Sequence, residues 1–419
     1  MVSAKNLDYL VLSQAASFRS GITLPFQIVE NTFSDIEGIF NVSVPEDSVQ
    51  PWKSASGSIS RDRNQAIVGA VAEAMERYSA AVISFPIKKL QDLKGEKVIT
   101  HSEFSLFSEE QYNSSDFPWR KFGTDEAFFG EVFSVYDNEK FWVPQELIGL
   151  GTKSDEALIP STSTGLAAHF DKYKGLLLAI EELLERDALT VYWLNSLGGR
   201  EIRLEERYVA PITKKFGQVL CFDITQIWNP YPVVIVCGYL KQRNKKRISM
   251  GVACRETYEQ AIEKAYLEWI QGAIFAGFYD IYHPDIKLED KKDLIDFDEH
   301  AVYYTMYPDL WEQVPLLAKK FAYKKRIIKK REYDTKAILG RLLDKLKGVG
   351  IRIFYRDITL PDVREAGLNV IRVLSPELSL IHGDERAPFL GGRINDVKWR
   401  YPDLVNQIEF PNKYPHPLG

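Results

Sequence analysis

A long apolar helix that carries Glu182 and Glu185 in its middle is the feature that most constrains how this chain folds. From residue 173 to residue 193 the sequence reads YKGLLLAIEELLERDALTVYW, which is apolar on almost every helical face. Glu182 and Glu185 are three residues apart, so they project from one side of this helix, the side that also carries Leu178 and Leu189. Burying paired carboxylates is costly unless a cation neutralises them. We therefore expect a divalent metal beside this helix.

Two further predicted helices, at 65–82 and 258–278, also set acids among small residues. The first places Glu73 and Glu76 on a stripe with glycine and alanine, where a ligand or another backbone can come close. The second places Glu268 and Gln271 on a stripe with alanines. In any one helix such acids are weak evidence of a site, because glutamate is a good helix former and usually lies on the solvent-exposed face. Three helices with the same arrangement favour a shared site.

The acids of these helices predict a magnesium site for nucleotide chemistry. Mg²⁺ takes oxygen ligands and commonly bridges to substrate phosphates. The sequence contains neither GxxxxGK[ST] nor GxGxxG, so this would be nucleotide binding without a P-loop. Zinc is disfavoured, because His169 is the one candidate zinc ligand near the acids. The GxSxG motif of a serine hydrolase is also absent from the sequence.

Composition indicates an ordinary globular protein, and with both helices and strands predicted we expect an α+β fold. The 419 residues are 45% hydrophobic and 26% charged, and the net charge of −5 gives no reason to expect nucleic acid or an anionic membrane as a partner. No apolar run is long enough to span a membrane, and residues 1–14 lack the order of a signal peptide, so we expect a cytoplasmic protein. Cys221, Cys237 and Cys254 lie in β-like apolar runs and are expected to be core thiols.

We expect an N-terminal segment, 1–60, wrapped on a main domain, 61–419. A βαβ-like rhythm is predicted from a helix at 335–347 and strands at 351–359 and 368–375. The basic stretch 319–331 is either a solvated helix face or a docking patch. Further strands are expected at 219–225, 232–240 and 247–254, and an extended proline-rich tail at 411–419.

The helix motifs together resemble those of the YcaO family. GAVAEAMER (69–77) is similar to the family motif SxxxExxER, with Gly69 in place of Ser. TSTGLAAH (162–169) precedes ELLERDA (182–188), as the small polar stretch precedes ExxERDA in the family. The motif AxxxAxxExxQ is met within 261–271. The resemblance covers about 55–419 and implies a YcaO-type ATP-binding fold, mixed sheets packed with helices that carry acidic metal ligands.

The resemblance also implies roles for single residues. The family's GKG segment is replaced here by SASGSISRDRN (54–64), so Arg61 or Arg63 would take the place of its lysine. Arg77 and Arg186 would face the phosphates, or else only pair with the adjacent acids. Magnesium ligands would be Glu73, Glu76, Glu182, Glu185 and Glu268, and the nucleotide contacts Ser163, Thr164 and Gln271.

The C-terminal tail bears on the reaction. Azoline-forming members commonly end in PxPxP, and this chain ends in Pro415-His416-Pro417-Leu418-Gly419, with two of those prolines. The resemblance to the microcin-synthetase branch implies a cyclodehydratase whose His416 or Gly419 carboxylate relays protons. A surface tail with an exposed His416 is the alternative.

The implied activity is ATP- and Mg²⁺-dependent cyclodehydration of Cys, Ser or Thr in a ribosomally made precursor peptide, as in biosynthesis of thiazole/oxazole-modified peptide antibiotics. Because only about 60 residues precede the first motif, we expect a separate leader-binding, ubiquitin-activating-like partner in a multi-subunit complex, with a flavin-dependent azoline dehydrogenase as a further partner. The rivals are a thioamide- or amidine-forming enzyme and a noncatalytic ATP-binding accessory subunit.

Overall fold

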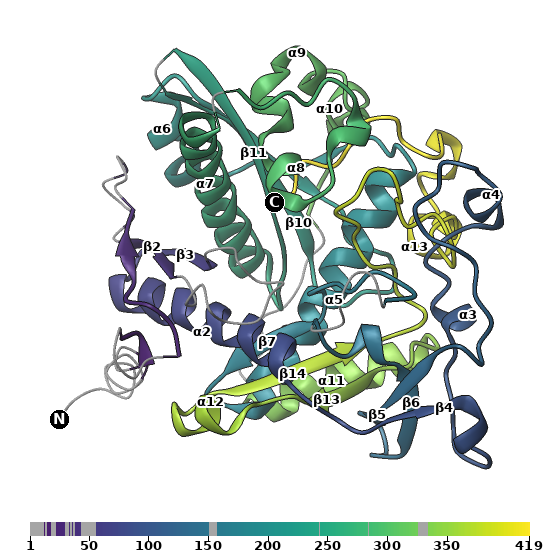
Figure 1. Ribbon diagram of the computed structural model, residues 1–419. Helices are drawn as coiled ribbons and strands as arrows, with labels where there is room; N and C mark the ends of the chain where they lie inside the picture. The colour runs from purple at the N-terminus through teal and green to yellow at the C-terminus, as the bar shows by residue number, and fades with distance from the viewer. Residues whose placement is uncertain are drawn as a thin grey trace. The chain divides into compact units, whose positions relative to one another are not determined.

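The computed structural model describes the ranges 56–150, 157–242, 244–283, 285–325 and 334–419, and before them residues 12, 15–17, 22–29, 33, 36 and 38–42 (Figure 1). The chain divides into two compact units. Unit 1 comprises 1–105, 119–183 and 333–377, and unit 2 comprises 106–118, 184–332 and 378–419. The division falls inside one helix, α5 (Lys172–Leu194), so that Glu182 belongs to unit 1 and Glu185 to unit 2.

Unit 1 contains two antiparallel sheets. The smaller sheet has the strand order β1-β2-β3, and the larger has the order β4-β5-β13-β14-β7, with β6 pairing on β5. The strands of the smaller sheet are β1 (Gln27–Ile28), β2 (Gly38–Val42) and β3 (Ser56–Ser60). Those of the larger sheet are β4 (Ile87–Lys89), β5 (Phe128–Ser134), β6 (Lys140–Pro144), β7 (Leu166–His169), β13 (Phe354–Asp357) and β14 (Asn369–Leu374).

Helix α2 (Arg63–Val82) packs against β2 and β3 (Figure 1). It begins at Asp62, whose side chain accepts a hydrogen bond from the Gln65 amide at 3.0 Å, as expected of an N-cap. Its buried face consists largely of alanines, which let the helix approach the sheet closely. The other helices of unit 1 are α3 (His101–Phe104), α11 (Thr335–Gly348), α12 (Pro361–Glu365) and the 3₁₀ turns η1 (Leu90–Asp92) and η2 (Gln145–Leu147).

Unit 2 is built on a sheet with the order β11-β10-β9-β8-β12, antiparallel except for the β8–β12 pair. Helix α7 (Tyr258–Tyr282) lies along β10 and β11 (Figure 1). The approach is close, because a Cβ at Gly251 would lie 2.1 Å from the Ala265 carbonyl oxygen and one at Gly272 would lie 2.1 Å from Ser249 Oγ. The strands are β8 (Arg200–Glu201), β9 (Gln218–Asp223), β10 (Val233–Gln242), β11 (Lys245–Cys254) and β12 (Phe321–Ala322).

The remaining helices of unit 2 are short. They are α4 (Glu109–Tyr112), α6 (Glu206–Thr213), α8 (Phe297–Met306), α9 (Pro308–Trp311), α10 (Pro315–Ala318), α13 (Val397–Arg400), η3 (Lys291–Asp293) and η4 (Val405–Gln407).

The α+β class, the helices that carry the acids and the predicted strands are confirmed, and Cys221, Cys237 and Cys254 are buried free thiols. The βαβ-like rhythm is wrong, because β13 and β14 pair antiparallel through α12. Of the basic stretch, Lys319 and Lys320 form ion pairs with Glu409 and Glu201, and 326–331 lies outside the described residues. Much of the predicted N-terminal segment also lies outside them. No helix in the described ranges is long and apolar enough to cross a membrane.

Candidate active site

Helix α2 presents its two acids beside β3. The Gly57 amide donates a hydrogen bond to Glu73 Oε2 at 3.2 Å, and Arg77 forms ion pairs with Glu73 at 3.8 Å and Glu76 at 3.9 Å. Gly69 leaves room for β3 and not for a ligand, since a Cβ there would lie 2.4 Å from Ser58 Oγ. The alternative role predicted for Arg77, pairing with adjacent acids, is therefore present in the structure.

Glu76 is the most perturbed acid of this group. Burial raises its pKa to about 8, the nearby Arg77 opposes the shift, and the like charges of Glu182 and Glu73 add to it. The shift therefore reflects mainly the burial of a carboxyl group, to which the neighbouring acids add. A divalent cation would reverse the shift.

The segment before β7, which carries Ser163 and Thr164, is fastened to β14. Arg372, 1% exposed, donates to the carbonyl oxygens of Thr162 and Thr164, each at 2.7 Å. Its charge also interacts favourably with Glu182 and Glu76. Arg372 therefore interacts both with the loop predicted to contact a nucleotide and with two of the predicted metal ligands.

In unit 2 the second half of α5 carries Glu185 and Arg186. Glu185 is 5% exposed, accepts a hydrogen bond from the Cys254 amide at 3.2 Å, and lies 3.5 Å from the Arg186 guanidinium. The next residue, Asp187, is fully buried and forms a two-point ion pair with Arg400, at 2.6 and 2.9 Å. This pair anchors the half of α5 that bears Glu185.

Glu268 of α7 lies in the same unit. Burial alone would raise its pKa, but the cation of Lys264, 2.9 Å away, and the more distant Arg186 and Arg255 together hold the pKa below its usual value. Arg186 thus serves both Glu185 and Glu268. Gln271 is half-buried one turn further along the helix.

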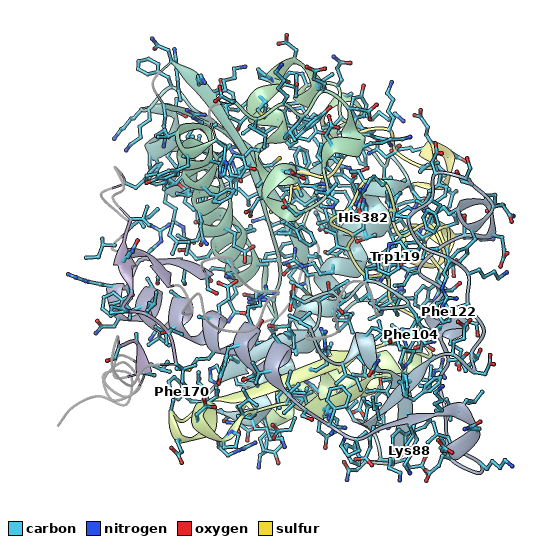
Figure 2. The ribbon with its side chains drawn as sticks, viewed as in Figure 1. Lys88, Phe104, Trp119, Phe122, Phe170 and His382 are labelled. Carbon is cyan, nitrogen blue, oxygen red and sulfur yellow. The ribbon has the colours of Figure 1, made fainter. Side chains whose placement is uncertain are left out.

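The C-terminal tail packs its His416 against two buried histidines of unit 2, His300 and His382, and Figure 2 labels His382. The His416 ring stacks on the His300 ring at 4.1 Å, its Nε2 bonds the His382 carbonyl oxygen at 2.8 Å, and its Nδ1 accepts from the Leu418 amide at 3.4 Å. Burial lowers the pKa of His416 well below its usual value. Pro415 through Leu418 are buried and Gly419 is exposed, so the surface-tail alternative is wrong.

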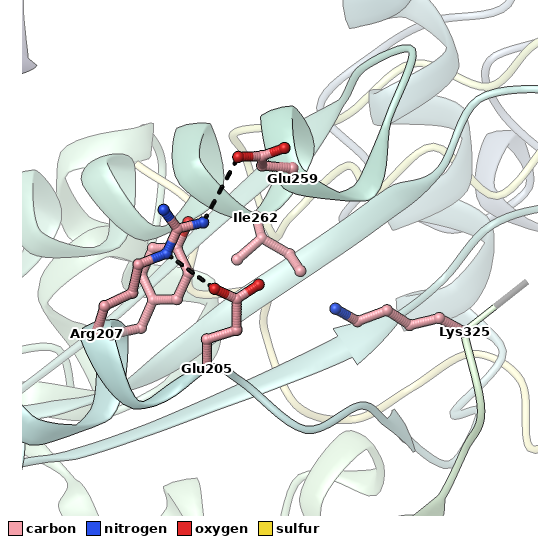
Figure 3. A pocket seen from close by; sticks show the side chains of 6 residues that line it. Glu205, Arg207, Glu259, Ile262 and Lys325 are labelled. Carbon is pink, nitrogen blue, oxygen red and sulfur yellow. Dashed lines mark ion pairs between the residues drawn. The ribbon is translucent and has the colours of Figure 1, made fainter. Parts of the chain in front are cut away.

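A hollow of about 310 Å³ lies at the start of α6 and α7 (Figure 3). Its charges compensate one another, since Arg207 pairs with Glu205 at 3.1 Å and with Glu259 at 3.8 Å. It is lined by Glu205, Arg207, Tyr208, Glu259, Ile262 and Lys325. None of the predicted site residues lies among them, and we assign this hollow no ligand.

The family model for the YcaO cyclodehydratase, described as ATP- and Mg²⁺-binding, matches residues 59–379. The chain belongs to the YcaO family. Its domain is therefore an ATP- and Mg²⁺-binding one, and the YcaO-type fold is confirmed. No curated protein matches the chain by sequence.

Solved structures share the YcaO fold at low identity. A heterocyclase in complex with substrate and cofactor has a TM-score of 0.76 and 18% identity, and the match covers 98% of this chain and 57% of that one. YcaO from Methanopyrus kandleri, bound with AMPPCP and Mg²⁺, has a TM-score of 0.67 and 14% identity over 92% of this chain and 94% of its own. The E. coli microcin synthetase McbBCD complex has a TM-score of 0.60 and 17% identity, and the match covers 86% of this chain and 90% of that one. The chain thus spans little more than half of the first heterocyclase.

The residues present fit a magnesium–nucleotide complex. In the described ranges no group of three His, Cys, Asp or Glu side chains could by itself hold a metal ion. Mg²⁺ does not require such a cage, since it keeps several waters and uses one or two carboxylates together with substrate phosphates. Burial raises the pKa of Glu76, and a cation beside it would stabilise its charged form.

Sequence reasoning missed Arg372, Asp187 and Arg400. Arg372 had a readable signal, because it is a charged residue inside the apolar strand NVIRVL of β14. Arg400 had none, since its partner Asp187 lies 213 residues earlier in the chain.

Proposed function

We propose that this YcaO chain catalyses the ATP- and Mg²⁺-dependent cyclodehydration of Cys, Ser or Thr residues in a ribosomally made precursor peptide. The observation that carries the proposal is the acid group of α2, where Glu73 and Glu76 both pair with Arg77 and burial raises the pKa of Glu76 to about 8. The family model supports the same cofactors. The product would be a thiazoline or an oxazoline.

In the proposed reaction, the substrate thiol or hydroxyl attacks the preceding backbone carbonyl, forming a ring and an oxyanion. Phosphorylation of that oxygen makes it a leaving group, and its departure as phosphate, with loss of the amide proton, forms the C=N bond. Bound ATP with Mg²⁺ supplies the phosphoryl group and offsets its charge. The chain's own contribution is to place donors and acids around that charge before the reaction.

We assign the roles within each unit. The nucleotide is contacted by the loop with Ser163 and Thr164, by the segment with Arg61 and by Gln271 of α7. The guanidinium groups of Arg77 and Arg186 balance the charge of the acids and of the phosphates. Proposed magnesium ligands are Glu73, Glu76 and Glu182 of unit 1 and Glu185 and Glu268 of unit 2.

Of the two predicted proton-relay groups, the geometry favours the Gly419 carboxylate. Both ring nitrogens of His416 already have partners, and burial keeps the ring neutral, so His416 holds the tail in place. Gly419 is exposed, so we assign the proton relay to its carboxylate.

The partners follow from the chemistry and from the relatives. The solved E. coli microcin synthetase is a complex of several proteins, and one structure of it has pro-MccB17 bound. We propose by analogy that this chain works with a separate leader-binding, ubiquitin-activating-like protein, and that a flavin-dependent dehydrogenase oxidises the azolines.

Binding of AMPPCP with Mg²⁺, measured by calorimetry, tests the site without needing a partner. Glu182→Gln should lose most of the magnesium-dependent affinity. Glu139→Gln, which alters a half-exposed acid paired with Lys97 in the same unit, should retain it. Equal affinity in the two variants would remove Glu182 from the metal site.

Turnover with a Cys/Ser/Thr-rich precursor and a leader-binding partner tests the reaction. Loss of one water per modified residue together with ADP formation supports cyclodehydration. Exchange of an amide oxygen for sulfur would indicate a thioamide-forming enzyme. A ring closed by an amine would indicate an amidine-forming enzyme. Tight AMPPCP binding without ADP formation would indicate an accessory subunit.

A further inference from the structure

Arg372 of β14 is a buried cation whose hydrogen bonds all go to backbone carbonyls in unit 1. It donates to Ile148 at 2.9 Å and to Thr162 and Thr164 at 2.7 Å each. A guanidinium is a planar fork of five donors, so it can hold separate carbonyls in one fixed geometry, which an ammonium cannot do. The two threonine carbonyls flank Ser163, so the fork fixes the loop that we assign to the nucleotide.

The same loop has a second attachment to β14. The Val373 amide donates to the Gly165 carbonyl oxygen at 2.7 Å. Gly165 has a φ of +84°, and a Cβ on it would lie 2.3 Å from the Val373 carbonyl oxygen, so only glycine fits. The backbone of 162–165 is therefore shaped before any ligand arrives.

The three carbonyl oxygens accept hydrogen bonds from Arg372 but do not neutralise its charge. The charge is offset by Glu182 and Glu76, and Arg77 repels it. These two acids are proposed magnesium ligands, so Arg372 stands in the field of the metal site while its donors hold the nucleotide loop.

We propose that Arg372 is a positioning residue that holds the 162–165 loop in its nucleotide-binding shape and moderates the attraction of the unit 1 acids for Mg²⁺. This inference rests on the proposed function. It predicts opposite changes in two affinities. Loss of the cation should raise the affinity for Mg²⁺ alone, because a repulsion is removed, and should lower the affinity for the nucleotide, because the loop is no longer held.

Arg372→Met and Arg372→Lys separate the two effects. In Arg372→Met the affinity for Mg²⁺ alone should rise on the order of tenfold, since a nearby positive charge has gone. The affinity for AMPPCP at saturating Mg²⁺ should fall at least tenfold. Arg372→Lys keeps the charge and loses the fork, so only the AMPPCP affinity should fall.

Two further variants guard against misfolding and trivial effects. Gly165→Ala disturbs the loop and leaves the charge, so it should behave as Arg372→Lys does. Arg352→Met is the matched control, because it removes a guanidinium of the same unit that pairs with Glu377 and Glu103, and both affinities should stay at the wild-type value. Thermal melting of each variant verifies that it is folded.

Amide hydrogen exchange of the protein without ligands gives a readout independent of binding. The Leu166 amide, which bonds the Ser163 carbonyl oxygen at 3.1 Å, and the Val373 amide should exchange faster in both Arg372 variants. Unchanged exchange, or a Mg²⁺ affinity in Arg372→Met that falls or stays constant, would overturn the inference. Failure of the wild-type chain to bind AMPPCP would overturn the proposed function instead.

Discussion

Removing the charge of Asp187 should destabilise unit 2 severely. Its carboxylate accepts four hydrogen bonds, two from Arg400 at 2.6 and 2.9 Å, one from the Ser379 amide at 2.7 Å and one from Gln226 at 3.0 Å. Both members of the ion pair have 0% exposed side chains. Asp187→Asn preserves the shape, but it leaves the Arg400 guanidinium buried without an anion and turns one acceptor into a donor.

The expected cost is about 3–5 kcal/mol, the range for breaking a buried pair by removing one partner. Urea unfolding followed by tryptophan fluorescence measures it. The matched control is Asp384→Asn, which breaks a 2.7 Å pair with Arg386 whose side chains are 27% and 48% exposed, and should cost under about 1 kcal/mol.

Combining Asp187→Asn with Arg400→Met should recover part of the loss, because the double variant buries no unpaired cation. A loss below about 1 kcal/mol in Asp187→Asn, or a double variant that is worse by the sum of the single losses, would refute the reasoning. In either case the pair would not be what anchors the second half of α5.

Three further outcomes are expected. Gly69→Ala should cost about 1–3 kcal/mol, because its Cβ would meet Ser58 Oγ at 2.4 Å, and Ser58→Gly should restore most of the stability measured by urea unfolding. Burial lowers the pKa of His300 to about 4, so the unfolded chain binds the proton first as the pH falls. About 3 kcal/mol of stability, fully present above pH 6.5, should therefore be lost by pH 4. His300→Phe should make the urea midpoints less dependent on pH over this range. Burial raises the pKa of Cys221 and Cys237, so neither should react with a thiol reagent at pH 8 until the protein unfolds, and modification of native protein would contradict their place in the core.

The sequence predicted the acid-bearing helices well, because their pattern is local. The acids at 73, 76, 182, 185 and 268 fall on helices whose bounds differ from the expected ones by only a few residues. Local pattern also identified the strand expected at 232–240, which is β10 in the structure and is buried along most of its length.

What the sequence could not show was long-range pairing. The partners of Arg372 lie more than 200 residues away, and no periodicity in NVIRVL points to Thr162 or Thr164. The βαβ-like rhythm was misleading because the order of a helix at 335–347 and two following strands does not show in which direction the strands pair, and β13 and β14 pair antiparallel.

Stripes of small residues were also ambiguous. Gly69 was taken to leave space for a ligand or a neighbouring backbone, and β3 is the neighbour that fills it. The sequence shows that something must come close to such a stripe, and only the structure shows what does.

The C-terminal segment has a consequence for how unit 2 is made in the cell. Asp187 forms its ion pair with Arg400. The last turn of α5 accepts a hydrogen bond from Asn412, whose side chain donates to the Trp193 carbonyl oxygen at 2.9 Å. A nascent chain leaves the ribosome from its N-terminus, so α5 emerges about two hundred residues before these partners. Until they arrive, its apolar surface and buried acid are open to chaperones and proteases. Premature termination after β14 would therefore yield a chain that keeps every acid of the site but lacks Arg400, the buried partner of the α5 half that bears Glu185.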